Sequence, residues 1–189
     1  KRFILISIIF VLVTIIFTFP LVLRINSCIA GWHSTDEPYA ALWNFWWLKY
    51  AHAHHINDAY YYTIAAPFGM NGKSGYLVWN FINKWFSIVT NNIIAYNMEV
   101  FFSFFASAVL MYFLVFYLTK NTVAGIISAI IYTLSPYHFV RIWQHLGLAQ
   151  IQWLPLYLLS FLVLRNNPGL LNSICVALAL FLVMSFDSY

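Results

Sequence analysis

Charged residues are scarce in this chain of 189 residues. Asp, Glu, Lys and Arg together make up 7% of it, whereas 63% of its residues are hydrophobic. Soluble globular domains carry roughly 25% charged residues, so this shortage argues against a soluble protein. The sequence therefore predicts an integral membrane protein.

Cysteine and blocks of like charge are also nearly absent. Cys28 follows the first apolar segment and Cys175 lies inside a late one. We expect them at different membrane depths, which argues against a disulfide or a cysteine metal site. The net charge of +4 comes from scattered residues rather than from a Lys/Arg block. We therefore expect no nucleic-acid partner, and we expect the basic residues to set topology and to contact membrane lipid.

What the chain does contain is a series of apolar segments, each near the ~20 residues that an α-helix needs to cross the hydrocarbon core. Because lipid offers the backbone no hydrogen bonds, we expect these segments to be helical. They predict an all-α fold, a polytopic transmembrane helix bundle in one domain, residues 1–189. The chain starts without methionine and stops at Tyr189 just after an apolar segment, so we expect both ends to be cut from a longer protein, of which this is the N-terminal portion. The expected spans are residues 3–23, 93–118, 123–140, 148–164 and 169–186.

Basic residues predict how these spans are oriented. They precede the first span and occupy the short connections at Lys120 and Arg165. By the positive-inside rule these places are cytoplasmic, and so is the N-terminus. The long loop at residues 24–92 and the connection at 135–150 then share the extracytoplasmic face of the inner (plasma) membrane. Three of the five acidic residues lie in the long loop, so we look for function there.

An aromatic helix is expected near the start of the long loop, with Pro38 in its first turn. Its aromatic residues follow helical spacing and form one stripe, which favours an amphipathic helix lying flat at the lipid head groups. A second apolar and aromatic stretch, residues 76–89, is expected to be another surface segment. The stripe consists of Trp43, Trp46, Trp47, Tyr50 and His54.

Asp36 and Glu37 stand directly before this helix. Either carboxylate could act as a general base or a metal ligand, and either could instead cap the helix. Capping favours the ionised form, which suits a base better than an acid. The histidines that close the helix lack the i, i+4 spacing of a zinc helix, so we interpret them as interfacial polar residues.

A polar cluster between two apolar segments contains His138, Arg141 and His145. In a continuous helix their i, i+3, i+7 spacing would give one basic face suited to phosphate. An interfacial loop with a snorkelling arginine explains them equally well. Pro136 is expected to end or kink the helix here.

Several stretches of the chain carry a resemblance to a known family. They are Thr35–Pro38, Leu42–Lys49, Asn57–Tyr62, Ala66–Asn71, Leu134–His138, Gln144–Leu146 and Gln152–Tyr157. These stretches resemble bacterial multi-pass glycosyltransferases of the GT-C type, which use polyprenyl-phosphate sugars. The resemblance covers most of the chain in consistent order, although Thr35 stands where the family leads us to expect glycine.

The resemblance implies transfer of a sugar from a polyprenyl-phosphate donor to a glycan, lipid or protein acceptor on the outer face, in cell-envelope modification. It implies that Asp36 is the catalytic base of an inverting displacement. The remaining implied roles are substrate binding by the charged and aromatic loop residues and, as an option, binding of a divalent metal ion by Asp36 and Glu37. The implied substrate-binding residues are Glu37, Trp43, Trp46, Trp47, His138, Arg141 and His145.

Two other functions remain open. A transporter or flippase for a lipid-linked or small solute would use Asp36, Glu37 and Arg141 along its access path. That function predicts polar residues deep in the spans, of which the sequence offers few. A non-catalytic scaffold would use the aromatic loop to bind a partner.

Overall fold

The protein is mostly helical in the computed structural model, which describes residues 2–31, 37–62, 64, 66–71 and 77–186. Within these ranges there are eight α-helices, a short 3-10 helix and an antiparallel hairpin whose strands have two residues each. The predominance of helix confirms the expected all-α fold. The elements are α1 (Arg2–Phe17), η1 (Leu21–Arg24), α2 (Glu37–Ala53), β1 (Tyr60–Tyr61), β2 (Met70–Asn71), α3 (Leu77–Val89), α4 (Asn92–Thr119), α5 (Thr122–Thr133), α6 (Pro136–Gln144), α7 (Trp153–Asn166) and α8 (Leu170–Phe186).

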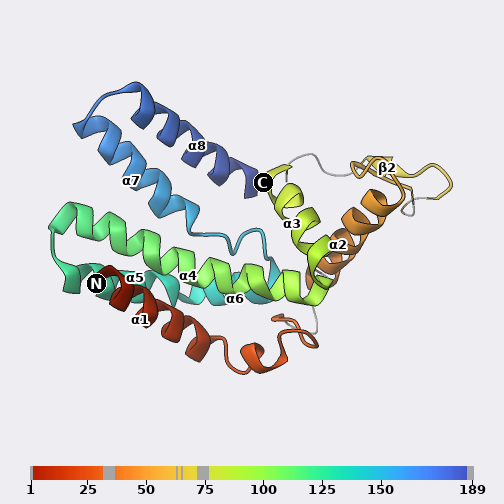
Figure 1. Cartoon of the computed structure of the whole chain (residues 1–189), viewed down its shortest axis with the longest axis horizontal. Helices are drawn as coiled ribbons and strands as arrows, with labels where there is room; N and C mark the ends of the chain where they lie inside the picture. The colour runs from red at the N-terminus through yellow and green to blue at the C-terminus, as the bar shows by residue number, and fades with distance from the viewer. Residues whose placement is uncertain (1, 32–36, 63, 65, 72–76, 187–189) are drawn as a thin grey trace.

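Helix α4 is the long central helix, and α1, α2, α3, α5 and α7 pack against it (Figure 1). The Asn91 side chain caps its start by accepting hydrogen bonds from the backbone N–H groups of Ile93 and Ile94. Its end is marked by Lys120, whose φ of 55° leaves the helical region. Among the described residues α4 is the one helix long and apolar enough to cross a membrane by itself. Its 28 residues extend about 42 Å, more than the hydrocarbon core requires.

The third expected span, residues 123–140, is broken into α5 and α6. The two helices meet at 40° and together would also be long and apolar enough to cross a membrane. The break lies at Pro136, as its chemistry predicts, because proline has no N–H to continue α5. Ser135 caps the new helix by accepting from the backbone N–H of His138.

The other apolar helices are shorter than the sequence predicts. Helix α1 stops at Phe17, before Pro20, and α7 begins at Trp153 rather than at residue 148. Residues 145–152 instead form turns in which Gln150 and Ile151 donate backbone hydrogen bonds. Helix α8 covers most of the expected residues 169–186.

Two apolar clusters hold the helices together. The larger one joins η1, α2, α4 and α6 through buried side chains such as Leu21, Phe45 and Ile142. The smaller one joins α1, α4 and α5 around Phe10 and Tyr112. Both clusters lie along α4, which therefore fixes the position of the loop elements as well as of the apolar helices.

Two α-helices, a 3-10 helix and a short hairpin make up much of the described part of the loop between α1 and α4. Helices α2 and α3 lie side by side at one end of the molecule, with the β1–β2 hairpin beyond them (Figure 1). Lys84 of α3 forms an ion pair of 2.7 Å with Asp58 near the hairpin. Asn97 of α4 holds the start of the loop, donating to the carbonyl oxygens of Ile25 (2.8 Å) and Cys28 (2.6 Å).

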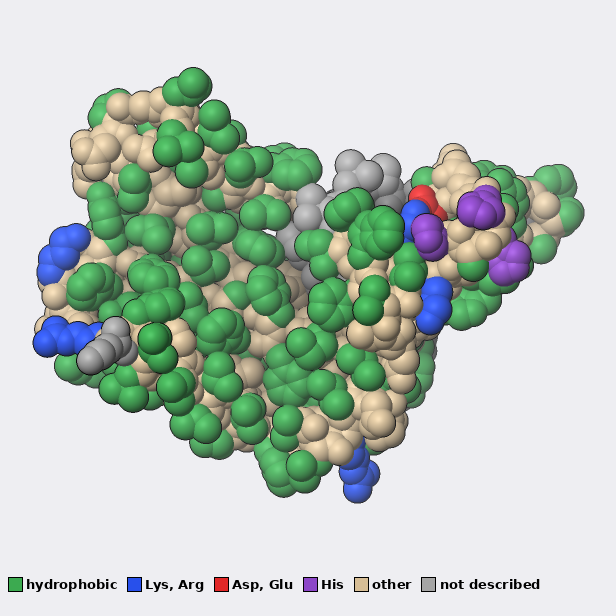
Figure 2. Space-filling model, viewed as in Figure 1, with side chains coloured by type: hydrophobic (Ala, Val, Ile, Leu, Met, Phe, Trp, Pro, Cys, Tyr) green, Lys and Arg blue, Asp and Glu red, His purple; other side chains and the backbone are tan. Residues whose placement is uncertain are grey.

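Apolar side chains cover much of the molecular surface. Figure 2 shows hydrophobic side chains over most of one face, with charged and His side chains mainly at its edges. On α1 and α8 large side chains such as Ile4, Ile16 and Leu171 are more than 60% exposed, at 63%, 66% and 73%. Exposed apolar surfaces of this kind mark a site of contact with another protein or with a membrane.

Candidate functional site

The first turn of α2 meets the end of α6, although more than 100 positions separate them in the sequence. Oε2 of Glu37 lies 3.9 Å from Nε2 of His145, close enough for an ion pair when the imidazole is protonated. Glu37 is more than half exposed and His145 is mostly covered. The loop at 24–92 and the connection at 135–150 therefore come together at these two candidate residues.

Gly31 allows this close approach. A Cβ at Gly31 would lie 3.0 Å from Cγ of Pro38 and 3.7 Å from the backbone oxygen of Trp143. The lack of a side chain at Gly31 thus lets the chain pass between the first turn of α2 and the last turn of α6.

Arg141 lies one helical turn before His145. Its guanidinium stacks over the Tyr137 ring, with 5.1 Å from Cζ to the ring centroid. Its Nε atom is buried and has no hydrogen-bond acceptor among the described residues. A buried donor without an acceptor costs about 1–3 kcal/mol, which an oxygen of phosphate or carboxylate would offset. Arg141 is therefore the residue of this site best suited to hold an anion.

His138 is placed differently from what its spacing predicts. It is fully buried, with Nδ1 2.7 Å from the carbonyl oxygen of Thr133 and Nε2 2.9 Å from the hydroxyl oxygen of Ser103. Helix α6 ends at Gln144, so His145 leaves the helical path and the three residues do not share one exposed face. The predicted basic face is thus reduced to Arg141 and His145, and His138 joins α6 to α4.

The buried network around His138 was not predicted from the sequence. The Ser103 hydroxyl lies 2.6 Å from the carbonyl oxygen of Ala149 and 3.3 Å from Oε1 of Gln152. Nε2 of Gln152 in turn donates to Oε1 of Gln150 over 2.8 Å. The signal that could have found it is the pair of glutamines inside an apolar stretch, because buried amides need partners.

The aromatic rings of α2 lie on one side of the helix, as their spacing requires. Trp43 stacks on Trp47 with ring centroids 6.0 Å apart, and Trp46 lies beside both. Trp47 is fully buried and donates its indole N–H to the backbone oxygen of Asp58 over 3.0 Å, whereas Trp46 is 41% exposed. Only part of the stripe is therefore available to a sugar, a lipid chain or a membrane surface.

Tyr61 of the hairpin extends this aromatic group. Its ring meets Trp43 edge-on, with centroids 5.0 Å apart. Burial, and to a smaller extent the nearby Asp58 charge, raise the pKa of Tyr61 above its usual value. Its phenol therefore stays protonated and donates to Oδ1 of Asn44 over 3.3 Å.

Asp36, the predicted catalytic base, lies outside the described residues, and so does its neighbour Thr35. The position of Glu37 nevertheless fixes where the chain enters α2, beside His145. Within the described ranges no group of three His, Cys, Asp or Glu side chains is placed to bind a metal ion. The metal site expected at Asp36 and Glu37 stays a prediction.

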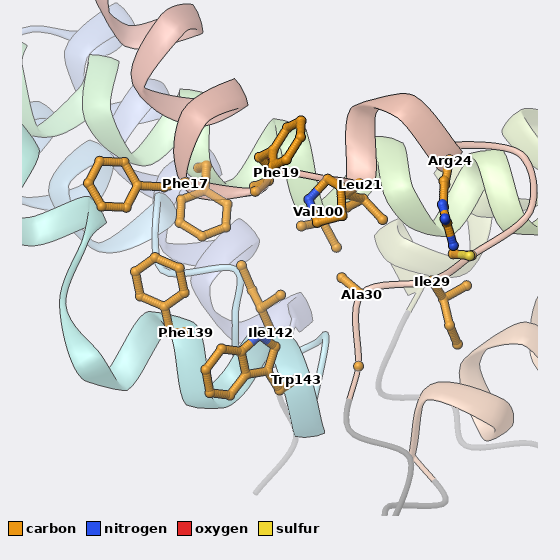
Figure 3. Close-up of a pocket in the computed structure, with 15 residues that line it drawn as sticks. Phe17, Phe19, Leu21, Arg24, Ile29, Ala30, Val100, Phe139, Ile142 and Trp143 are labelled. Carbon is orange, nitrogen blue, oxygen red and sulfur yellow. The ribbon is translucent and has the colours of Figure 1, made fainter.

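An apolar pocket of about 370 Å³ adjoins this site. Its wall includes Gly31 and Trp143, the same two residues that border the contact between α2 and α6. Figure 3 shows Phe17 and Phe139 at one end of the pocket and Arg24 with Ile29 at the other. The pocket therefore lies between the end of α1, η1, α4 and α6.

No protein-family model, curated protein or solved structure matches the chain.

Proposed function

We propose that the protein is a polytopic membrane glycosyltransferase of the GT-C type. It transfers a sugar from a polyprenyl-phosphate donor to an acceptor on the extracytoplasmic face of the inner membrane. Asp36 takes the proton from the acceptor hydroxyl as that oxygen attacks the anomeric carbon, and the lipid phosphate leaves with its bonding electron pair. Arg141 and His145 hold the departing phosphate.

The exposed apolar surfaces support a multi-pass arrangement. In the proposed topology α4 is one span, α5 with α6 is a broken span, and α1, α7 and α8 are tilted or shorter spans. The large exposed side chains on α1 and α8 favour lipid as their surroundings, because exposing so large an apolar surface to water is unfavourable. The helical break at Pro136 then lies against protein on the α4 side, where irregular backbone is tolerated inside membranes.

The observation that carries the proposal is the meeting of Glu37 with His145. It brings the residue after Asp36 to the cluster that contains Arg141, whose buried Nε has no acceptor among the described residues. A carboxylate base and an anion-binding arginine in one site are what a sugar transfer from a lipid phosphate requires. The rings of Trp43 and Trp46 border the same end of the molecule and offer faces for stacking on a sugar.

The decisive experiment measures sugar transfer from labelled polyprenyl-phosphate sugars in membranes of cells that express the protein. Asp36→Asn is compared with wild type at matched expression, and Glu37→Gln is the control that changes the neighbouring carboxylate. Loss of a general base lowers transfer by about a hundredfold or more, so only Asp36→Asn is expected to fall that far. Equal transfer by wild type and Asp36→Asn would remove Asp36 from catalysis.

Transport is the second candidate, and the polar side chains buried along α4 favour it. Four polar side chains are buried on this helix, namely Asn97, Glu99, Ser103 and Ser107. A span that faced only lipid would not carry so many. A carboxylate at such a position often lies on an ion or substrate path. Uptake of labelled lipid-linked sugar into protein-containing vesicles that is lost in Glu99→Gln, without any transfer product, would favour transport over catalysis.

A further inference from the structure

The pocket beside the proposed active site has an apolar lining with one charged side chain at one end. Aromatic and aliphatic side chains make up most of its wall, and Phe17, Phe139 and Trp143 enclose one end (Figure 3). Arg24 of η1 is the one charged residue among the described residues that line it. At about 370 Å³ the pocket falls in the range of about 300–1,000 Å³ that small-molecule sites occupy.

Arg24 has no carboxylate partner in the described part of the chain. The two ion pairs found there join Lys84 to Asp58 and His145 to Glu37. Arg24 is exposed and sits in the last turn of η1, directly after α1. A guanidinium at the end of an apolar helix lies at the depth of lipid phosphates when that helix enters a membrane. The charge at this end of the pocket thus favours binding of an anion, and the remaining apolar wall favours binding of a hydrocarbon chain.

We propose that this pocket is a binding site for an anionic membrane phospholipid. The phosphate lies against the guanidinium of Arg24, and one acyl chain lies along the wall formed by Phe17, Phe139 and Trp143. This site is separate from the proposed donor-phosphate site, because that site uses Arg141 and His145, which are not among the residues that line the pocket. The proposal goes beyond sugar transfer and stands whether or not the protein has that activity.

Cys28 offers a direct measure of occupancy because its side chain lines the pocket and is exposed. The experiment uses the Cys175→Ser protein in detergent micelles, so that Cys28 is the one thiol left. The rate of Cys28 alkylation by a maleimide is measured while dioleoyl phosphatidylglycerol is titrated into the micelles. Bound lipid is expected to slow alkylation in a saturable way, and dioleoyl phosphatidylcholine is expected to need a higher concentration for the same effect.

Two variants test the two ends of the site. Arg24→Gln should weaken protection by phosphatidylglycerol about fivefold, the scale of one arginine at an anionic surface. Ala30→Leu should weaken protection by filling the pocket while leaving Arg24 in place. Arg165→Gln, which removes a charge at the exposed end of α7, should not change it. Each variant is compared with itself in the absence of lipid, since removing Arg24 can alter thiol reactivity directly.

Several results would overturn the proposal. Equal protection by phosphatidylcholine, or unchanged protection in Arg24→Gln, would mean that Arg24 makes only general contact with head groups. Protection by inorganic phosphate alone at the same concentration would leave a simple anion site without a lipid chain. Tighter protection by a polyprenyl phosphate than by phosphatidylglycerol would assign the pocket to an isoprenoid lipid instead. Unchanged protection in Ala30→Leu would place the acyl chain elsewhere.

Discussion

The hydrogen bond between Ser103 and His138 is the contact that places α6, and with it Arg141, against α4. Both side chains are fully buried, and their polar atoms lie 2.9 Å apart. We expect Ser103→Ala to cost about 1–3 kcal/mol, because Nδ1–H of His138 donates to Thr133 and Nε2 then loses the hydroxyl proton that it accepts from Ser103. His138→Phe keeps most of the ring volume and should cost about 1–3 kcal/mol through the lost bond to Thr133.

The double variant separates this bond from general damage to the core. Once His138 is replaced, Ser103→Ala no longer leaves an imidazole nitrogen unpaired, so its cost should fall by about 1–2 kcal/mol. The free energy of unfolding is measured for all four proteins by detergent titration in mixed micelles, followed by far-ultraviolet circular dichroism. Ser173→Ala on the exposed start of α8 serves as the control for serine, and its effect should add to that of His138→Phe.

Additivity would contradict the reasoning. Independent sites add within about 0.5 kcal/mol, so a coupling smaller than that would mean that Ser103 and His138 do not bond in the folded protein. The same result would return His138 to the candidates for binding phosphate, because its Nε2 would then be available. A coupling of the expected size fixes His138 as a positioning residue of α6.

Two further changes test the packing around the site. Gly125→Ala on α5 should destabilise the protein by about 1–2 kcal/mol, because the new Cβ would lie 2.7 Å from the Tyr112 ring. A lower unfolding midpoint in mixed micelles would show this loss of stability. An unchanged midpoint would mean that α4 and α5 pack less closely. Lys84→Met should lower the free energy of unfolding by about 0.5 kcal/mol at low salt and by less at high salt, because the ion pair with Asp58 is partly exposed. An effect that does not depend on salt would refute an electrostatic origin.

The helices could be predicted from the sequence because each depends on residues close together in the chain. Apolar runs predict α4, α7 and α8, and Pro136 predicts the break between α5 and α6. The start of α2 at Glu37 follows from an acidic residue before Pro38. Such signals are local, so they survive without knowledge of the tertiary structure.

The contacts that build the site could not be predicted in the same way. The Asn97 side chain bonds to backbone groups 67 to 72 positions earlier, and no periodicity encodes that distance. His138 was expected on an exposed basic face because helical spacing was extended to His145, but α6 ends one residue before His145. Helical spacing gives which residues share a face, and packing decides which way that face points.

Gly31 joins the proposed active site to the lipid pocket, and this gives a test of whether the two depend on each other. A methyl group there would lie 3.0 and 3.3 Å from the ring carbons of Pro38, which belongs to the first turn of α2 and cannot rotate away. Gly31→Ala should therefore move that turn away from Trp143. This movement would widen the gap between Glu37 and His145 and would also shift one wall of the pocket. We expect sugar transfer and the protection of Cys28 by phosphatidylglycerol to fall together, with helix content unchanged by circular dichroism. A loss of transfer with full lipid protection would show that the contact serves the active site alone, because α2 can then move without moving the wall of the pocket.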